Sequence, residues 1–323
     1  LFSGAAEALV VEKRTELTAP TLYGSTVLDP LAVNFTPVQK LSAVGKDGDV
    51  LHMHVDATCD HQLVSWQLST QSYLPTVVNL QINTPIDTSY SVNENQFWVL
   101  NNRTKDFYLR MVDFEDDDPV SVGITRFSGK VGQASQVVAT DSYAVLRYKI
   151  ETVEYVAVID LDSQSIISDE VTPDKPWEVA AWDAANGRIY YLSDGKLFSR
   201  ELVGAILDDA FQSPDYGITQ PASTSSEIVV SADGDFLIVG GGRYDTDSLI
   251  WLDSIGNDED NEVADVAAWS SDSTVYAFNS GGDSALEEWS LSLGGDDHFE
   301  LLTETSLSGA DSSNNNTLLF PMM

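Results

Sequence analysis

The sequence has a single cysteine, Cys59, among its 323 residues, so it can form no internal disulfide bond. One cysteine leaves the redox compartment open, because exported and cytosolic proteins both occur without disulfides. Long apolar runs are missing as well: no stretch approaches the ~18 apolar residues that a membrane-spanning helix needs. We therefore expect no insertion into a membrane.

Basic residues are also scarce. The chain has 16 lysines and arginines against 51 aspartates and glutamates, which gives a formal net charge of −35. Such a surface repels phosphate backbones and anionic lipids, which excludes nucleic acid as a partner. Two origins of the acidity stay open, namely adaptation to high salt, which screens self-repulsion, and a working role in binding cations. The hydrophobic content of 43% predicts a folded core.

A short pattern that ends a strand-like run recurs along the chain at intervals of roughly 40–50 residues. Its six copies are Trp66-Gln67-Leu68, Val112-Asp113-Phe114, Ile159-Asp160-Leu161, Arg200-Glu201-Leu202, Leu252-Asp253-Ser254 and Trp289-Ser290-Leu291. A seventh, Thr15-Glu16-Leu17, lies near the other end of the chain. A strand-built repeat of this length is typical of the blades of a β-propeller.

We predict an all-β fold in which residues 1–323 form a single β-propeller domain of seven four-stranded blades. The seventh blade combines residues 306–323 with residues 5–42, so that strands from both termini close the ring and leave no open sheet edge. We expect at most one helical turn, at residues 205–211. The other six blades run approximately over residues 43–85, 86–130, 131–173, 174–215, 222–263 and 264–305.

Four dipeptides predict the hairpin turns within these blades. Asn-Gly and Asp-Gly tolerate the positive φ angles of tight turns. Three of them lie where the first hairpin of a blade should turn, and the fourth fits the next turn of its blade. They are Asp47-Gly48, Asn186-Gly187, Asp233-Gly234 and, at the second turn, Asp194-Gly195.

One of these turns carries a family resemblance. The run Ser231-Ala232-Asp233-Gly234-Asp235-Phe236-Leu237-Ile238 resembles the S-P-D-G turn-and-strand repeat of TolB-like and related bacterial envelope propellers. Residues 271–276 are a weaker version, and Ala232 and Ser271 replace the prolines of the family pattern. The resemblance implies a propeller of the seven-bladed superfamily and a place in the periplasm, at the cell surface or outside the cell. Residues 1–6 fit the remnant of a removed export signal or a boundary introduced by cloning.

The first candidate site is the mouth of the central channel. Loops from every blade converge there on rigid inner strands, which is where we expect a ligand. Trp177 would form an apolar wall beside Glu178 and is the best candidate for an exposed aromatic contact. The alternative is a water-filled channel lined by ordinary polar groups. Aligning the inner strands places at one level Lys40, Thr88, Ser135, Glu178, Ser226, Asp265 and Ser306.

Two further patterns suggest metal ions. His52, His54 and Asp56 would share one face of a strand, and imidazole and carboxylate suit Zn²⁺. One strand alone does not make three ligands converge, so packed or exposed histidines are the alternative. The acidic loops at residues 115–118 and 257–262 offer oxygen ligands for Ca²⁺, although runs of like charge are usually solvated turns.

These observations predict a monomeric, non-catalytic binding module of the cell envelope or the secreted fraction. It would recognise a protein partner or a small cationic ligand at the channel mouth and would hold no resident cofactor. One alternative is a metal-assisted hydrolase or lactonase, in which Ca²⁺ in the channel polarises a substrate oxygen or activates water. Another is a structural subunit of an envelope assembly. Neither Gly-x-Ser-x-Gly nor another catalytic signature is present in the sequence.

Overall fold

A computed structural model describes the strands of the chain and many of the turns between them, and all regular elements in the described residues are β-strands. These strands assemble into sheets. The described residues are 10–16, 42–44, 50–55, 61–67, 72–79, 85–91, 96–103, 106–115, 118–128, 132–163, 165–172, 177–215, 228–231, 233–239, 241–257, 262–263, 266–271, 274–279, 285–292 and 298–306.

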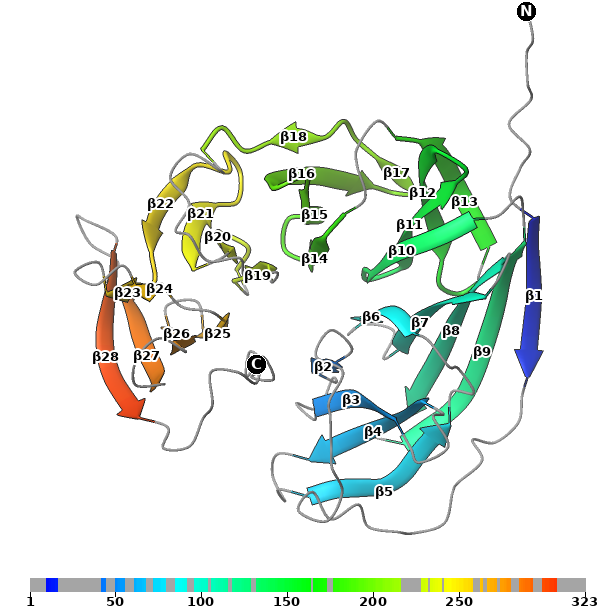
Figure 1. Cartoon of the computed structure of the whole chain (residues 1–323), viewed down its shortest axis with the longest axis horizontal. Helices are drawn as coiled ribbons and strands as arrows, with labels where there is room; N and C mark the ends of the chain where they lie inside the picture. Colours follow the sequence, from blue (N-terminus) through cyan, green and yellow to red (C-terminus); the bar gives the residue numbers. More distant parts are fainter. Residues whose placement is uncertain are drawn as a thin grey trace, which may run out of the picture. The chain divides into compact units, whose positions relative to one another are not determined.

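The chain divides into two compact units, Leu1–Pro176 and Trp177–Met323. The described part of the first unit forms three antiparallel sheets, drawn from blue to green in Figure 1. The first contains β2 (Ser42–Val44), β3 (Val50–Val55), β4 (His61–Gln67) and β5 (Ser72–Asn79). The second contains β6 (Pro85–Ser91), β7 (Gln96–Arg103), β8 (Asp106–Glu115) and β9 (Asp118–Ser128), with β1 (Val10–Glu16) beside β9. The third contains β10 (Gly132–Ala139), β11 (Tyr143–Ile150), β12 (Val153–Asp160) and β13 (Ser165–Val171).

The second unit repeats this meander. Its first sheet contains β14 (Val179–Asp183), β15 (Arg188–Ser193) and β16 (Lys196–Val203), and both β17 (Ile206–Leu207) and β18 (Phe211–Gln212) pair with β16. The next contains β19 (Ile228–Val230), β20 (Phe236–Val239), β21 (Gly242–Asp245) and β22 (Trp251–Ser254). The short β23 (Gly256–Asn257) and β24 (Glu262–Val263) pair with each other. The last sheet contains β25 (Val266–Ser271), β26 (Thr274–Asn279), β27 (Ala285–Ser292) and β28 (His298–Ser306).

The pairing of β1 differs from the predicted closure of the ring. Val10 lies opposite Ser128 and Glu16 opposite Val122, so this strand extends the β6–β9 sheet. An edge strand such as β9 exposes a row of backbone N–H and C=O groups, and β1 satisfies them. Residues 10–16 therefore do not supply an outer strand of a seventh blade. Ring closure and the number of blades stay predictions, because residues 17–41 and 307–323 lie outside the described part.

The repeat pattern is out of register in one sheet. Five of its six copies fall at the third strands of their sheets, β4, β8, β12, β16 and β27. Leu252-Asp253-Ser254 instead lies on β22, the fourth strand. The third strand there is β21, where Arg243 lies opposite Asp253 and binds its carboxylate with Nε and Nη2, at 2.8 and 2.9 Å. Because β21 and β22 are both short and each has an Asp near its end, the sequence pattern alone does not distinguish the third strand from the fourth.

The predicted turns within the described residues are confirmed by their backbone angles. Gly187 and Gly234 have φ values of 66° and 78°, each in the first hairpin of its sheet. Asp194 and Gly195 both have positive φ, 54° and 65°, as the two central residues of a type I′ hairpin turn require. Residues 205–211, where at most a helical turn was expected, contain β17 and part of β18. Asp47-Gly48 lies outside the described residues.

Each unit buries an apolar core between neighbouring sheets. In the first unit, Trp98 and Leu100 of β7 pack against Leu146 and Tyr148 of β11, and all four are at most 1% exposed. In the second unit, Tyr190 of β15 packs with residues of β20 and β21, including Leu237, Val239 and Tyr244. Central strands buried on both faces read as continuous apolar runs. This explains why the sequence shows little alternation along them.

Candidate functional site

Asp183 builds a buried polar turn at the end of β14. Its side chain is 2% exposed, and its carboxylate accepts hydrogen bonds from the backbone N–H groups of Ala185 and Asn186, at 3.0 and 3.1 Å. The carboxylate also accepts from Asn186 Nδ2 at 2.9 Å and from the Tyr190 hydroxyl at 3.1 Å. Asp is suited to this position because its short side chain bonds the backbone two or three residues ahead.

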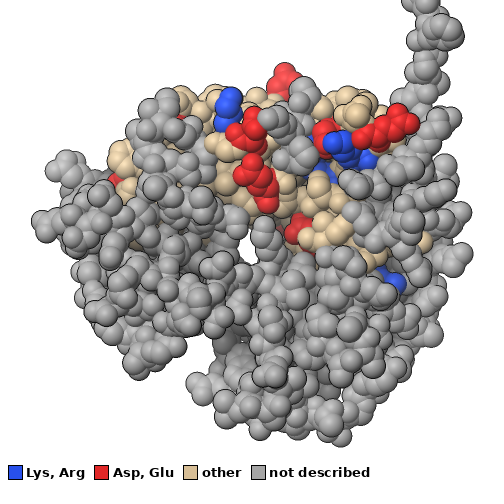
Figure 2. All heavy atoms as spheres, viewed as in Figure 1, with Lys and Arg blue, Asp and Glu red and all other residues tan. Residues whose placement is uncertain are grey.

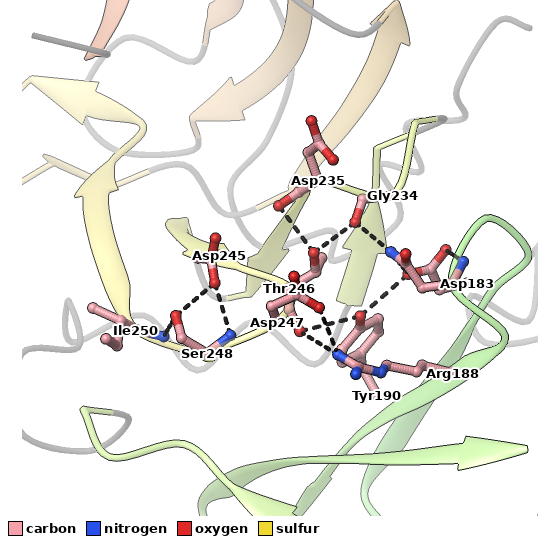
Figure 3. Close-up of polar contacts among 11 residues, drawn as sticks. Asp183, Arg188, Tyr190, Gly234, Asp235, Asp245, Thr246, Asp247, Ser248 and Ile250 are labelled. Atoms are coloured by element: carbon pink, nitrogen blue, oxygen red, sulfur yellow. Dashed lines mark hydrogen bonds and ion pairs between the residues drawn. The ribbon is translucent and has the colours of Figure 1, made fainter.

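This turn is bonded to the next sheet. Asn186 Nδ2 donates to the Gly234 carbonyl oxygen at 2.7 Å, and Thr246 Oγ1 donates to the same oxygen at 2.6 Å. Figure 3 shows Thr246 bonded to Gly234, and the Tyr190 hydroxyl lying between Asp183 and Thr246. We call Asp183, Asn186, Tyr190, Gly234 and Thr246 the polar junction. Four of these residues are buried and Asn186 is exposed, and their hydrogen bonds fasten the β14–β18 sheet to the β19–β22 sheet.

The rim of the polar junction is charged and exposed. Arg188 Nη1 lies 3.0 Å from Asp247 Oδ1, and the Asp247 side chain is 83% exposed, so this ion pair contributes little stability. Within the junction, burial is the main cause that raises the pKa of Tyr190 above the ordinary value, and the negative charge of Asp183 adds to it. Tyr190 therefore stays protonated and keeps donating. The polar junction thus holds two sheets together.

The predicted channel-mouth residues are only partly described. Thr88 lies half-buried on β6, and Ser135 lies at a bulge in β10, where its Oγ is 3.5 Å from the Arg147 carbonyl oxygen. Both belong to the first unit. The sequence alignment predicts Ser306 on an inner strand. In the structure it ends β28 opposite Ala285, so it lies on the fourth strand of its sheet. Lys40, Ser226 and Asp265 lie outside the described residues, and a ring of all these positions stays a prediction.

The side chain of Trp177 is buried, which corrects its prediction as an exposed contact. It is 4% exposed and stacks on Tyr191 at a ring-centroid distance of 4.5 Å. Tyr191 stacks in turn on Phe198, at 5.3 Å. Aromatic rings contribute large apolar areas to a core, and the stack on Tyr191 buries the ring of Trp177. Trp177 is thus an anchor for the residue that follows it.

Glu178, the next residue, is exposed and held at two points. Its backbone N–H donates to the Leu192 carbonyl oxygen at 2.8 Å, and its Oε1 accepts from the backbone N–H of Gly195 at 3.2 Å. The carboxylate therefore lies over the type I′ turn between β15 and β16, next to the exposed Asp194. Glu178 thus presents an exposed carboxylate directly after the buried side chain of Trp177.

The predicted metal ligands are not tested by the structure. His52 and His54 lie two residues apart on β3, opposite Val64 and Gln62 of β4, and Asp56 lies outside the described residues. Most of the acidic loops, including residues 116–117 and 258–261, is also outside them. Among the side chains that are described, no group of three or more His, Cys, Asp or Glu could hold a metal ion. Zn²⁺ and Ca²⁺ stay predictions.

Sequence reasoning missed an exposed apolar edge on the β14–β18 sheet. Val203, Ile206 and Phe211 are 63%, 67% and 48% exposed. The sequence does contain these apolar residues, separated by Asp208 and Asp209, but so short a run does not distinguish a strand from a helical turn.

In the part of the chain that the structure covers, no helix is long and apolar enough to cross a membrane.

Comparison with known proteins gives structural matches only. No protein-family model matches this sequence, and no curated protein matches it at a significant level. The WD40 repeats of RRP9 are 13% identical with a TM-score of 0.56, over 95% of this chain and 90% of that one. The β-propeller domain of Cps50 (Swd1) from Myceliophteria thermophila is 10% identical with a TM-score of 0.54, over 85% and 88%. A functionally unknown protein from Desulfotomaculum acetoxidans is 17% identical with a TM-score of 0.55, over 80% of each chain.

These likenesses inform on the fold and not on the activity. In all, 823 chains of solved structures match significantly, and a fold so widely shared serves many functions. The narrower resemblance to TolB-like propellers stays a prediction. Together with the antiparallel meanders of the two units, the matches show that the chain has a β-propeller fold.

Proposed function

We propose that this chain is a non-catalytic protein-interaction module, secreted or placed in the cell envelope. Its binding surface would include the loop before β14, at the predicted channel mouth, and its partner would present a lysine or arginine there. The propeller fold supports this proposal because it offers rigid sheets with loops at both ends, which is a common platform for binding. The net charge of −35 supports a cationic partner.

The observation that carries the proposal is the placement of Glu178. Glu178 is held in place before any partner arrives, because Trp177 is buried beside it and its own N–H and Oε1 are hydrogen-bonded. A preordered side chain loses little conformational entropy on binding. Its exposed carboxylate can therefore accept a charge-assisted hydrogen bond from an ammonium or guanidinium group with most of the interaction energy retained.

Other acidic side chains lie on the same sheet as Glu178. Figure 2 shows acidic side chains gathering over the β14–β18 sheet on the face that it presents. Such a field attracts a cationic partner and accelerates its association, and the attraction falls as salt is added. We expect the rate of association to decrease with ionic strength more than the rate of dissociation increases.

The test is the substitution Glu178→Gln, which retains the acceptor for the Gly195 N–H and removes the negative charge. Partners would be enriched from envelope and secreted fractions with the wild-type chain, and their affinities for both chains measured by titration calorimetry. A charge-assisted hydrogen bond exceeds a neutral one by about 1–1.5 kcal/mol, so affinity should fall about tenfold.

The matched control is Asp162→Asn, which removes one exposed charge from the first unit. This variant should bind as the wild type does, apart from a small effect on the rate of association. Equal affinity of the wild type and Glu178→Gln for every partner recovered would exclude Glu178 from the binding surface. Turnover of a candidate ester or lactone by the wild-type chain would favour the hydrolase alternative instead.

A further inference from the structure

The outer edge of the β14–β18 sheet is unusually apolar for an exposed strand. Between Val203 and Gln212, the side chains of Val203, Ile206 and Phe211 are 63%, 67% and 48% exposed. We call residues 203–212 the edge segment. Within the described part of the chain, β16 is the only strand that pairs with β17 or β18, so their outer side is an open sheet edge.

Hydrogen bonds with residues of β16 hold the edge segment in place. Buried Arg200 donates from Nε to the Asp208 carbonyl oxygen at 2.6 Å, and its Nη2 lies 3.4 Å from the Leu207 carbonyl oxygen. Asp208 exchanges backbone and side-chain hydrogen bonds with Glu201, with its own N–H donating at 3.0 Å and its Oδ1 accepting at 2.6 Å. The edge is therefore preordered, and its apolar side chains are exposed on a fixed backbone.

The spacing along the edge matches an extended peptide. Ile206 lies opposite Val203, and Phe211 lies opposite Ser199, four positions earlier on β16. A strand advances about 3.4 Å per residue, so the two apolar positions are about 14 Å apart. Asp208 and Asp209 lie between them in sequence and are exposed. A partner strand of matching chemistry needs apolar side chains at both ends and basic side chains between them.

Charge decides between the possible occupants of this edge. A second copy of this chain would bring another net charge of −35 to an edge that already exposes two aspartates, which opposes self-pairing. A segment that alternates apolar residues with lysine or arginine would cover the apolar side chains and neutralise the aspartates. Outer strand β13 also exposes Ile167 and Val171, which makes it the control edge for this proposal.

We propose that the edge segment, residues 203–212, binds an extended, basic and apolar segment of another protein by adding it as a further strand to the β14–β18 sheet. Main-chain hydrogen bonds supply affinity in this mode, and alternate side chains supply specificity. This surface is distinct from the loop that carries Glu178. Its proposal therefore stands or fails independently of the function proposed for that loop.

The probe is a fluorescein-labelled, end-capped hexapeptide of alternating valine and lysine, titrated with the purified full chain and followed by fluorescence anisotropy. We expect saturable binding that weakens at high salt, and much weaker binding of a valine–glutamate hexapeptide. Phe211→Ser and Ile206→Ser should each lower the affinity about tenfold, since each loses roughly half of a buried apolar side chain. Hydrogen exchange should slow at the backbone amides of residues 206–212 when the lysine peptide is bound.

Two matched variants locate the effect. Val153→Ser removes an exposed apolar side chain from the first unit, and Ile167→Ser does the same on β13; both should bind the lysine peptide as the wild type does. Absence of saturable binding, equal binding of the acidic peptide, or a loss caused by Ile167→Ser would overturn the proposal. So would a wild-type dimer in analytical ultracentrifugation that Phe211→Ser converts to a monomer, because the occupant would then be a second copy. Loss of binding by Glu178→Gln with full binding by Phe211→Ser would also overturn it and would leave the Glu178 surface standing.

Discussion

Gly234 is the position where a single methyl group should be most damaging. Its φ of +78° is a conformation that residues with a Cβ adopt at a cost of about 1–2 kcal/mol. A Cβ added there would lie 2.7 Å from Ala185 Cβ, 2.6 Å from Asn186 Nδ2 and 3.0 Å from Asp183 Oδ1. The Asn186 side chain can move away, but the Ala185 Cβ is fixed to the backbone of a tight turn.

The free energy of unfolding lost in Gly234→Ala can be built from these contacts. Overpacking of a close contact costs about 1–3 kcal/mol. Displacing Asn186 also sacrifices its hydrogen bond to the Gly234 carbonyl oxygen, which is worth about 1 kcal/mol. With the backbone term, we expect Gly234→Ala to lower the free energy of unfolding by about 3–6 kcal/mol.

Two other glycines provide the control. Gly195 and Gly204 also have positive φ, 65° and 62°, but an added Cβ would meet nothing within 4 Å at either position. Gly195→Ala and Gly204→Ala should therefore lose only the backbone term, about 1–2 kcal/mol. Urea unfolding followed by circular dichroism, compared at constant slope, measures all three variants. If Gly234→Ala is no less stable than Gly195→Ala, the close contact between the two sheets does not exist as described.

Two further predictions concern pH and metal ions. Tyr190 has a folded-state pKa raised above the ordinary value of 10.0, so above that pH the unfolded chain releases a proton that the folded chain keeps. The free energy of unfolding should therefore fall above that pH by up to about 1.4 kcal/mol per pH unit because of this group. Tyr190→Phe should be less stable at neutral pH by about 1 kcal/mol and should lack this pH dependence in unfolding curves recorded between neutral and alkaline pH. A stability difference between the two proteins that stays constant across that range would contradict the prediction. If the chain is the non-catalytic module proposed above and holds no metal, it should melt at the same temperature with EDTA as with added Ca²⁺ or Zn²⁺. A rise that EDTA reverses would instead indicate a site and favour the hydrolase alternative.

The turns show how far local sequence information reaches. Asn186-Gly187, Asp194-Gly195 and Asp233-Gly234 were predicted because a positive φ depends on the residue itself, and the structure has positive φ at all three glycines. The recurring strand pattern predicted propeller sheets for a similar reason, since strand length and turn chemistry are short-range properties. The fold class could thus be read from short local patterns together with their recurrence at intervals of roughly 40–50 residues.

The candidate sites depended on contacts that no local pattern contains. Glu178 was predicted as a channel-mouth residue, but its hydrogen bond to Gly195 and the burial of Trp177 arise from the packing of β14 on β15. The copy of the repeat at Leu252-Asp253-Ser254 lies on the fourth strand of its sheet and not on the third. The pattern could not show this, because the two successive short strands β21 and β22 both have an Asp near their ends. The edge segment was missed because exposure depends on which strands lie beside it.

The sequence by itself determined an acidic all-β chain with hairpins at the predicted glycines, because charge, strand propensity and turn angles are properties of neighbouring residues. Only the tertiary structure decided that β1 pairs with β9, that Asn186 bonds Gly234 across 48 positions of sequence, and that Val203, Ile206 and Phe211 lie on an open edge. Pairing partners and burial are set by the competition of all strands for edges and core volume. That competition is settled only when the whole chain folds.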